Sequence, residues 1–118
     1  MTIEELRIRI DELDRQLVDL LNERASAAKM VGHLKAATSL PVYEPNREKL
    51  VYANVRAANK GPLPDIELTH IYERIIDVMR ALQRNELASQ NSQANAQAAQ
   101  EGGPGHAAGA TPPETGKR

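Results

Sequence analysis

The sequence predicts an all-α protein built from three helices per chain, the first of them very long. Apolar residues recur at alternating steps of three and four through residues 3–34, which is the period of an amphipathic helix. Proline is absent before Pro41, so nothing interrupts this first run. No segment shows the strict alternation of apolar and polar residues that is typical of a half-buried strand.

The first helix is predicted to run from about Ile3 to Ala37. Thr2 and Glu5 have the spacing of a capping box, in which each side chain binds the other residue's backbone N–H. Gly32 is the only glycine inside the run. Residues 39–43 then form a loop.

Two shorter helices are predicted to follow. Pro45 suits the first position of a second helix, with Glu44 before it. That helix should end before the Lys60-Gly61-Pro62 segment. Asp65 is a candidate N-cap for a third helix. The apolar face of this third helix comprises Leu68, Ile71, Tyr72, Ile75, Ile76, Met79 and Leu82.

The composition changes near residue 88, which predicts the boundary of the folded domain. Residues 88–118 contain no Val, Ile, Leu, Met or aromatic residue and are rich in Ala, Gln, Gly and Pro. Such a segment buries too little apolar surface to offset the entropy lost on ordering. We therefore expect a domain at residues 1–87 and a disordered tail at 88–118, in which residues 94–100 could form a transient helix.

Charge and composition limit the class of protein. The formal net charge of −1 gives no general attraction to nucleic acid or to an anionic membrane. Without cysteine the chain has neither disulfides nor thiolate metal ligands. The charged N-terminus lacks a signal-peptide core, and no run is long enough to span a bilayer. A cytoplasmic protein is expected.

The length of the first helix predicts self-association. A helix of about 35 residues is about 50 Å long, whereas a compact globule of about 85 residues is only about 30 Å across. The apolar stripe would therefore project from a compact monomer. A second copy of the chain is the simplest partner that could cover it.

Several charged residues occupy positions that surface placement does not explain. Arg24 falls on the apolar seam, where a charge needs a partner. It could belong to a structural ion pair with Glu23 or Glu48, or it could bind an anion. Lys35 lies on the same helix face about 16 Å away. Arg7 lies about 25 Å from Arg24 on another face, so it could reach only the site of an antiparallel partner.

Residues from the other two helices could complete a polar pocket. Gln83 follows the inward face of the third helix, and a buried amide requires partners. Arg47 and Glu48 lie in the first turn of the second helix. Together with Arg24 and Lys35 they would suit a small anion. His33, His70 and His106 lack the spacing of metal ligands, so no metal site is expected.

Three segments resemble the type II, all-α chorismate mutases. They are LRIRIDELDRQLVDLLNERASAAKMVGHLK at residues 6–35, PVYEPNREK at 41–49 and IYERIIDVMRALQ at 71–83. The resemblance covers nearly all of residues 4–86. It implies a homodimer of intertwined three-helix chains in which two active sites are shared between the subunits.

The resemblance also implies a role for each site residue. Arg24 would clamp one substrate carboxylate, and Arg7 from the other chain would clamp the second. Lys35 and Gln83 would stabilise charge on the breaking ether oxygen. The remaining roles are as follows: Glu48 would accept from the ring hydroxyl, Arg47 would support Glu48, Glu44 would act mainly through its backbone, and Met79 would pack the wall where some members carry a small polar residue.

The implied reaction is the [3,3] rearrangement of chorismate to prephenate, a step toward phenylalanine and tyrosine. It is unimolecular and needs no metal or cofactor, in keeping with the lack of such motifs in the sequence. Two alternatives remain open at this point. One is an isochorismate-pyruvate lyase of the same fold, and the other is a non-catalytic helical dimerisation module.

Overall fold

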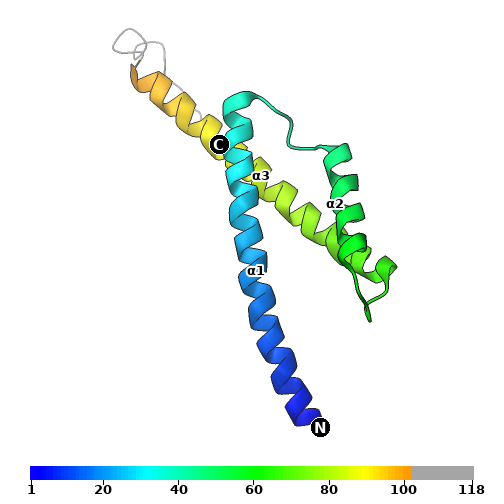
Figure 1. Ribbon diagram of the computed structural model, residues 1–118. Helices are drawn as coiled ribbons and strands as arrows, with labels where there is room; N and C mark the ends of the chain where they lie inside the picture. Colours follow the sequence, from blue (N-terminus) through cyan, green and yellow to red (C-terminus); the bar gives the residue numbers. More distant parts are fainter. Residues whose placement is uncertain (102–118) are drawn as a thin grey trace.

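The computed structural model describes residues 1–101, which form three helices joined by two short connections (Figure 1). Helix α1 spans Ile3–Thr38, α2 spans Pro45–Ala58 and α3 spans Asp65–Glu101. Within the described residues there is no strand. The predicted all-α class and the order of one long helix followed by two others are confirmed.

The ends of α1 follow the chemistry expected from the sequence. The backbone N–H of Thr2 donates to Glu5 Oε1 at 2.8 Å, and the backbone N–H of Glu5 donates to Thr2 Oγ1 at 3.1 Å. This is the predicted capping box. At the other end Ser39 adopts a left-handed conformation, φ 62°, and its N–H bonds the Lys35 carbonyl. The helix therefore stops one residue beyond the predicted end.

The start of α2 agrees with the prediction, whereas the start of α3 differs in detail. Pro45 is the first residue of α2, where its missing N–H costs nothing. Asp65 is the first helical residue of α3 and not the residue before it. Its carboxylate accepts from Asn59 Nδ2 at 2.6 Å, so the side chain ties the α2–α3 connection together.

Helix α3 continues past the position where the sequence predicted a disordered tail. It extends to Glu101, so residues 88–101 are helical in the structure. Alanine and glutamine have high helix propensity, and no helix breaker occurs before the glycine pair at 102–103. The lack of large apolar residues predicted a boundary near residue 88, whereas helix propensity alone lets the helix continue. The rest of the predicted tail, residues 102–118, lies outside the described residues.

Helices α1 and α3 cross at a point of very close approach (Figure 1). A Cβ added to Gly32 would lie 2.9 Å from Gln83 Cα and 3.0 Å from Gln83 O. Only glycine permits this distance, because real Cβ atoms avoid such contacts. The crossing places the middle of α3 beside the C-terminal half of α1, and α2 packs against the earlier part of α3 (Figure 1).

The single chain is elongated and has little core of its own. Its radius of gyration is 21.5 Å, compared with about 13 Å for a compact chain of 100 residues. Among the described residues the buried apolar side chains are Ala28, Ile76 and Met79. The predicted stripe of α1 stays exposed, including Leu6 and Leu17, and the N-terminal half of α1 projects away from the other helices (Figure 1).

The described part of the chain contains no helix with the length and apolar character needed to cross a bilayer.

Candidate active site

A cavity of about 390 Å³ lies where the three helices meet. Its walls come from the C-terminal half of α1, the loop before α2, the first turns of α2 and the middle of α3. Apolar side chains make up half of the lining: Ala27, Ala28, Val31, Val42, Val51, Ile76 and Met79. The other half is polar or charged: Arg24, Lys35, Glu44, Arg47, Glu48, Arg80 and Gln83.

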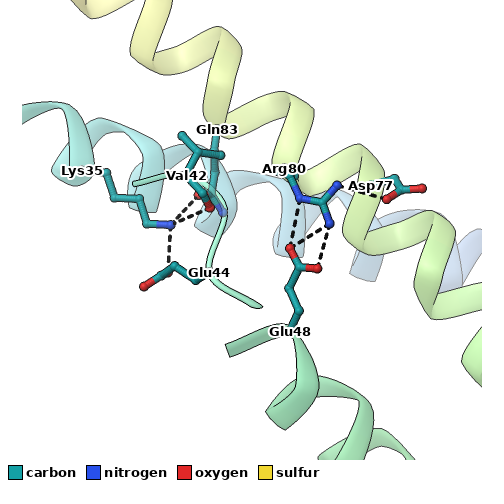
Figure 2. A network of polar contacts seen from close by, with 7 residues as sticks. All are labelled: Lys35, Val42, Glu44, Glu48, Asp77, Arg80 and Gln83. Atoms are coloured by element: carbon teal, nitrogen blue, oxygen red, sulfur yellow. Dashed lines mark hydrogen bonds and ion pairs between the residues drawn. The ribbon is translucent and has the colours of Figure 1, made fainter. Parts of the chain in front are cut away.

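Lys35 is the most deeply buried charged residue of this cavity, with 5% of its surface exposed. Its Nζ donates to the Val42 carbonyl at 3.1 Å and to Gln83 Oε1 at 2.9 Å. It also lies 2.9 Å from Glu44 Oε2 (Figure 2). An ammonium group has three N–H donors, and these three contacts use all of them. The buried charge is therefore fully compensated.

The contact with Lys35 fixes the orientation of the Gln83 amide. Since Gln83 Oε1 accepts from Lys35 Nζ, the amide NH₂ of Gln83 remains as a donor for another group. The backbone of Gln83 is held by the crossing at Gly32. The sequence predicted that Gln83 points inward, and its place on the cavity wall agrees with that prediction.

Glu48 and Arg80 form a second charged pair on the cavity wall (Figure 2). Arg80 Nη2 donates to Glu48 Oε1 and Oε2, both at 2.8 Å, and Arg80 Nε donates to Oε2 at 3.0 Å. Arg80 Nη1 also donates to Asp77 at 3.2 Å, and the guanidinium lies 5.3 Å from the centre of the Tyr43 ring. The hydrogen bonds to Glu48 raise the pKa of Arg80 further above its usual range. The guanidinium is therefore held in its charged form.

Arg24 and Arg47 are the other two cations of the cavity wall. Arg24 is half-buried, and in residues 1–101 no carboxylate lies within ion-pair distance of it. The structural ion pair that the sequence allowed for Arg24, with Glu23 or Glu48, is therefore not formed in the described chain. The same holds for Arg47, so two guanidinium groups are free to bind an anion.

Arg7 lies apart from this cavity. It is exposed on the N-terminal half of α1, about 25 Å from Arg24 along the helix axis. The structure thus brings together seven of the eight predicted site residues, in the cavity of one chain, and separates the eighth. This separation agrees with the helical geometry expected from the sequence.

Three details differ from the expectations drawn from the sequence. The partner of Glu48 is Arg80 and not Arg47. Arg80 lies on the face of α3 that is turned toward Glu48, whereas Arg47 is exposed on α2. Glu44 contacts Lys35 through its side chain, although a backbone role was expected. Arg80 was overlooked. Its position three residues before Gln83 would have placed it one turn away on the same helix face.

No group of three or more His, Asp or Glu side chains suited to a metal ion occurs in the part of the chain that is described.

Comparison with known proteins shows which family the chain belongs to. The sequence model of the family described as chorismate mutase type II matches residues 6–84. The chain belongs to this family. It is 34% identical to the chorismate mutase of Methanocaldococcus jannaschii over 84 residues, which is 70% of this chain and 85% of that protein.

Other members of the type II family are longer. The chain is 37% identical over 86 residues to the bifunctional chorismate mutase/prephenate dehydratase of Aquifex aeolicus, covering 70% of this chain and 24% of that protein. It therefore spans about a quarter of the length of such bifunctional relatives.

A solved structure from the family has the same fold. The chorismate mutase of Helicobacter pylori, in complex with prephenate, superposes with a TM-score of 0.67 at 31% identity. The superposition covers 73% of this chain and 93% of that one.

Proposed function

We propose that this chain is a chorismate mutase that converts chorismate to prephenate by an intramolecular [3,3] rearrangement in the cytoplasm. The observation that carries the proposal is the hydrogen bond between buried Lys35 and half-buried Gln83, which line a cavity with two free guanidinium groups. The rearrangement breaks one C–O bond and forms one C–C bond within the same molecule. It therefore requires positioning and charge stabilisation but no co-reactant.

The free guanidinium group of Arg24 would bind one end of the substrate. Chorismate carries two carboxylates, and a guanidinium binds a carboxylate through two parallel hydrogen bonds. Arg24 lies on the cavity wall, and it would bind one of them. Binding both carboxylates would fold the enolpyruvyl side chain over the ring, which is the conformer in which the reacting carbons meet.

Lys35 and Gln83 would act on the ether oxygen. Negative charge appears on this oxygen only as the C–O bond breaks, so donors aimed at it favour the transition state over the ground state. The NH₂ group of Gln83 is available for this role. Lys35 must first release one of its three contacts. Glu44 is the partner most easily displaced, because its side chain is 44% exposed.

The remaining wall residues would orient the ring. Glu48 keeps lone pairs that can accept from the ring hydroxyl, although both of its oxygens already bind Arg80. Arg47 would add positive charge at the mouth of the cavity. Met79 is buried and would provide apolar contact without a hydrogen bond.

The functional unit is proposed to be a homodimer in which Arg7 of the partner subunit binds the second carboxylate. Two features support this. The apolar stripe of α1 is exposed in the single chain, and Arg7 is too far from its own cavity to enter it. Sedimentation equilibrium at micromolar concentration should therefore give about twice the chain mass of 13.0 kDa. A stable monomer would refute the assembly.

The direct test is to supply chorismate and follow the product by proton NMR, which separates chorismate from its isomer prephenate. We expect prephenate from the wild-type chain and a loss of at least about 10²–10³ in kcat for Lys35→Ala. Supplying isochorismate in parallel tests the alternative reaction, since release of pyruvate from it alone would identify a lyase. A folded dimer that converts neither compound would be a dimerisation module.

A further inference from the structure

Arg80 makes more polar contacts than any other cation in the cavity, yet it has no contact with substrate in the proposed reaction. It binds both oxygens of Glu48, donates to Asp77 and lies against the Tyr43 ring. The side chains of Arg80 and Glu48 are 19% and 20% exposed, so the pair is largely removed from solvent. In such a setting the guanidinium is fixed in one orientation, and so is the carboxylate that it binds.

The charges around the cavity show why this pair matters for an anionic ligand. Lys35 is paired with Glu44, and Arg80 is paired with Glu48. Each pair is close to neutral. The wall charges that remain are Arg24 and Arg47, so the cavity of one chain has a positive balance that suits an anionic ligand.

Without Arg80 this balance would fail. Glu48 would then present an uncompensated carboxylate to the cavity. Like charges in a partly desolvated site repel strongly, because the effective dielectric constant there is well below that of water. The carboxylate would also be free to rotate, since Arg80 provides all of its side-chain hydrogen bonds within the described chain.

We propose that Arg80 is a positioning residue of the active site, which holds Glu48 in the orientation needed to accept from the substrate ring and cancels its charge toward a dianionic substrate. This inference rests on the proposed function of the cavity. Arg80 does not touch the substrate. It acts through Glu48, and it lets the site keep a hydrogen-bond acceptor without losing affinity for an anion.

The competing explanation is that the Arg80–Glu48 pair only fastens α2 to α3. The two explanations predict different results. Loss of a structural clamp lowers the stability of the fold, but it leaves substrate binding unchanged in the molecules that remain folded. Loss of charge compensation weakens the binding of a dianion, and removal of the charge on Glu48 should then restore it.

Four variants of the full-length protein test this: Arg80→Met, Arg80→Lys, Glu48→Gln and the double variant Arg80→Met/Glu48→Gln. The measurements are kcat and KM for chorismate, Kd for prephenate by calorimetry, and Tm. Arg74→Met is the matched control, because Arg74 is an exposed arginine of the same helix that lies outside the cavity.

Arg80→Met should raise KM and the prephenate Kd about tenfold, because the free carboxylate of Glu48 opposes the dianion. The double variant should recover most of this loss, since Gln has no charge and still offers a carbonyl oxygen. Arg80→Lys should keep KM within about threefold of wild type but lower kcat, because the charge remains and the two-pronged contact is lost. The control should match wild type.

Two results would overturn the inference. One is a wild-type KM and Kd for Arg80→Met in folded protein. The other is a raised KM that Glu48→Gln does not lower in the double variant. If Arg80→Met does not fold, Arg80→Lys decides, because a purely structural clamp would leave its kcat unchanged. Failure of the proposed function looks different, since the wild-type chain would then leave chorismate unconverted.

Discussion

Gly32 lies at the crossing of α1 and α3, where a single added methyl group should disturb both stability and chemistry. In Gly32→Ala the new Cβ would meet Gln83 Cα at 2.9 Å, Gln83 O at 3.0 Å and Glu86 Cβ at 3.2 Å. Ordinary carbon contacts are about 3.5–4.0 Å. Two of the three opposing atoms belong to the backbone of α3, so a rotamer change cannot relieve the contact. Helix α3 must move away by about 0.6 Å or more.

The size of the effect follows from two opposing terms. Overpacking of a tight contact costs about 1–3 kcal/mol. Replacing glycine by alanine inside a helix returns about 1 kcal/mol. We therefore expect a net loss of about 1 kcal/mol in the free energy of unfolding. The effect on chemistry should be larger. A shift of about 0.6 Å would carry the 2.9 Å contact between Lys35 Nζ and Gln83 Oε1 to the limit of hydrogen bonding.

The assay combines urea unfolding with steady-state kinetics on chorismate. A catalytic group displaced by about 1 Å can cost about 10²-fold, so the smaller shift should lower kcat about tenfold. Ser26→Ala is the control, because it changes helix propensity at an exposed position of α1. A Gly32→Ala protein that gains about 1 kcal/mol and keeps its kcat would show that the crossing does not position Gln83.

Three further outcomes are expected. Arg7→Ala and Arg24→Ala should each be nearly inactive alone, but mixed dimers should recover activity because one of the two shared sites then carries no lesion; no recovery would place both residues in the same chain's site. Gln83→Glu should be poor at pH 7.5 and improve toward pH 4.5, since only a protonated carboxyl can donate to the ether oxygen, and a profile parallel to wild type would remove that role. Burial and nearby carboxylates raise the pKa of Tyr52 above its usual value of 10.0. The neutral phenol therefore contributes fully to the stability of the fold below pH 10, and this contribution is lost as pH rises further. Tyr52→Phe should flatten this alkaline loss of stability in thermal melts.

The sequence predicted the helices well because their determinants are local. These determinants act within one or two helical turns: they are the capping box at Thr2, the proline at the start of α2 and the spacing of apolar residues by three and four positions. The continuation of α3 beyond residue 87 was not predicted, because the lack of burial was given more weight than local helix propensity. Lack of burial indicated disorder after residue 87, whereas an uninterrupted run of helix-forming residues continues the helix to Glu101.

The lining of the cavity was predicted in part, and the differences concern contacts between helices. Seven cavity residues could be identified from their register and from the family resemblance. The partner of Glu48 could not, because two arginines, Arg47 and Arg80, were equally suitable by charge. Only the packing of α2 against α3 decides between them. Likewise, a side-chain contact between Glu44 and Lys35 depends on how the loop before α2 folds back over α1.

The two halves of α1 have different surroundings, and the proposed homodimer would account for the length of the helix. The C-terminal half carries Arg24 and Lys35 into the cavity of its own chain. The N-terminal half contributes nothing to that cavity, and it presents Arg7 beside an exposed apolar stripe. A helix of 36 residues is about 54 Å long, long enough to reach a second cavity when two copies pair antiparallel. In the proposed dimer the contact that covers the apolar stripe would also bring Arg7 to the partner's cavity as the second guanidinium. Burial of the stripe and completion of the site would then be a single event, so a chain that had not paired would lack one of the two groups that hold a dicarboxylate.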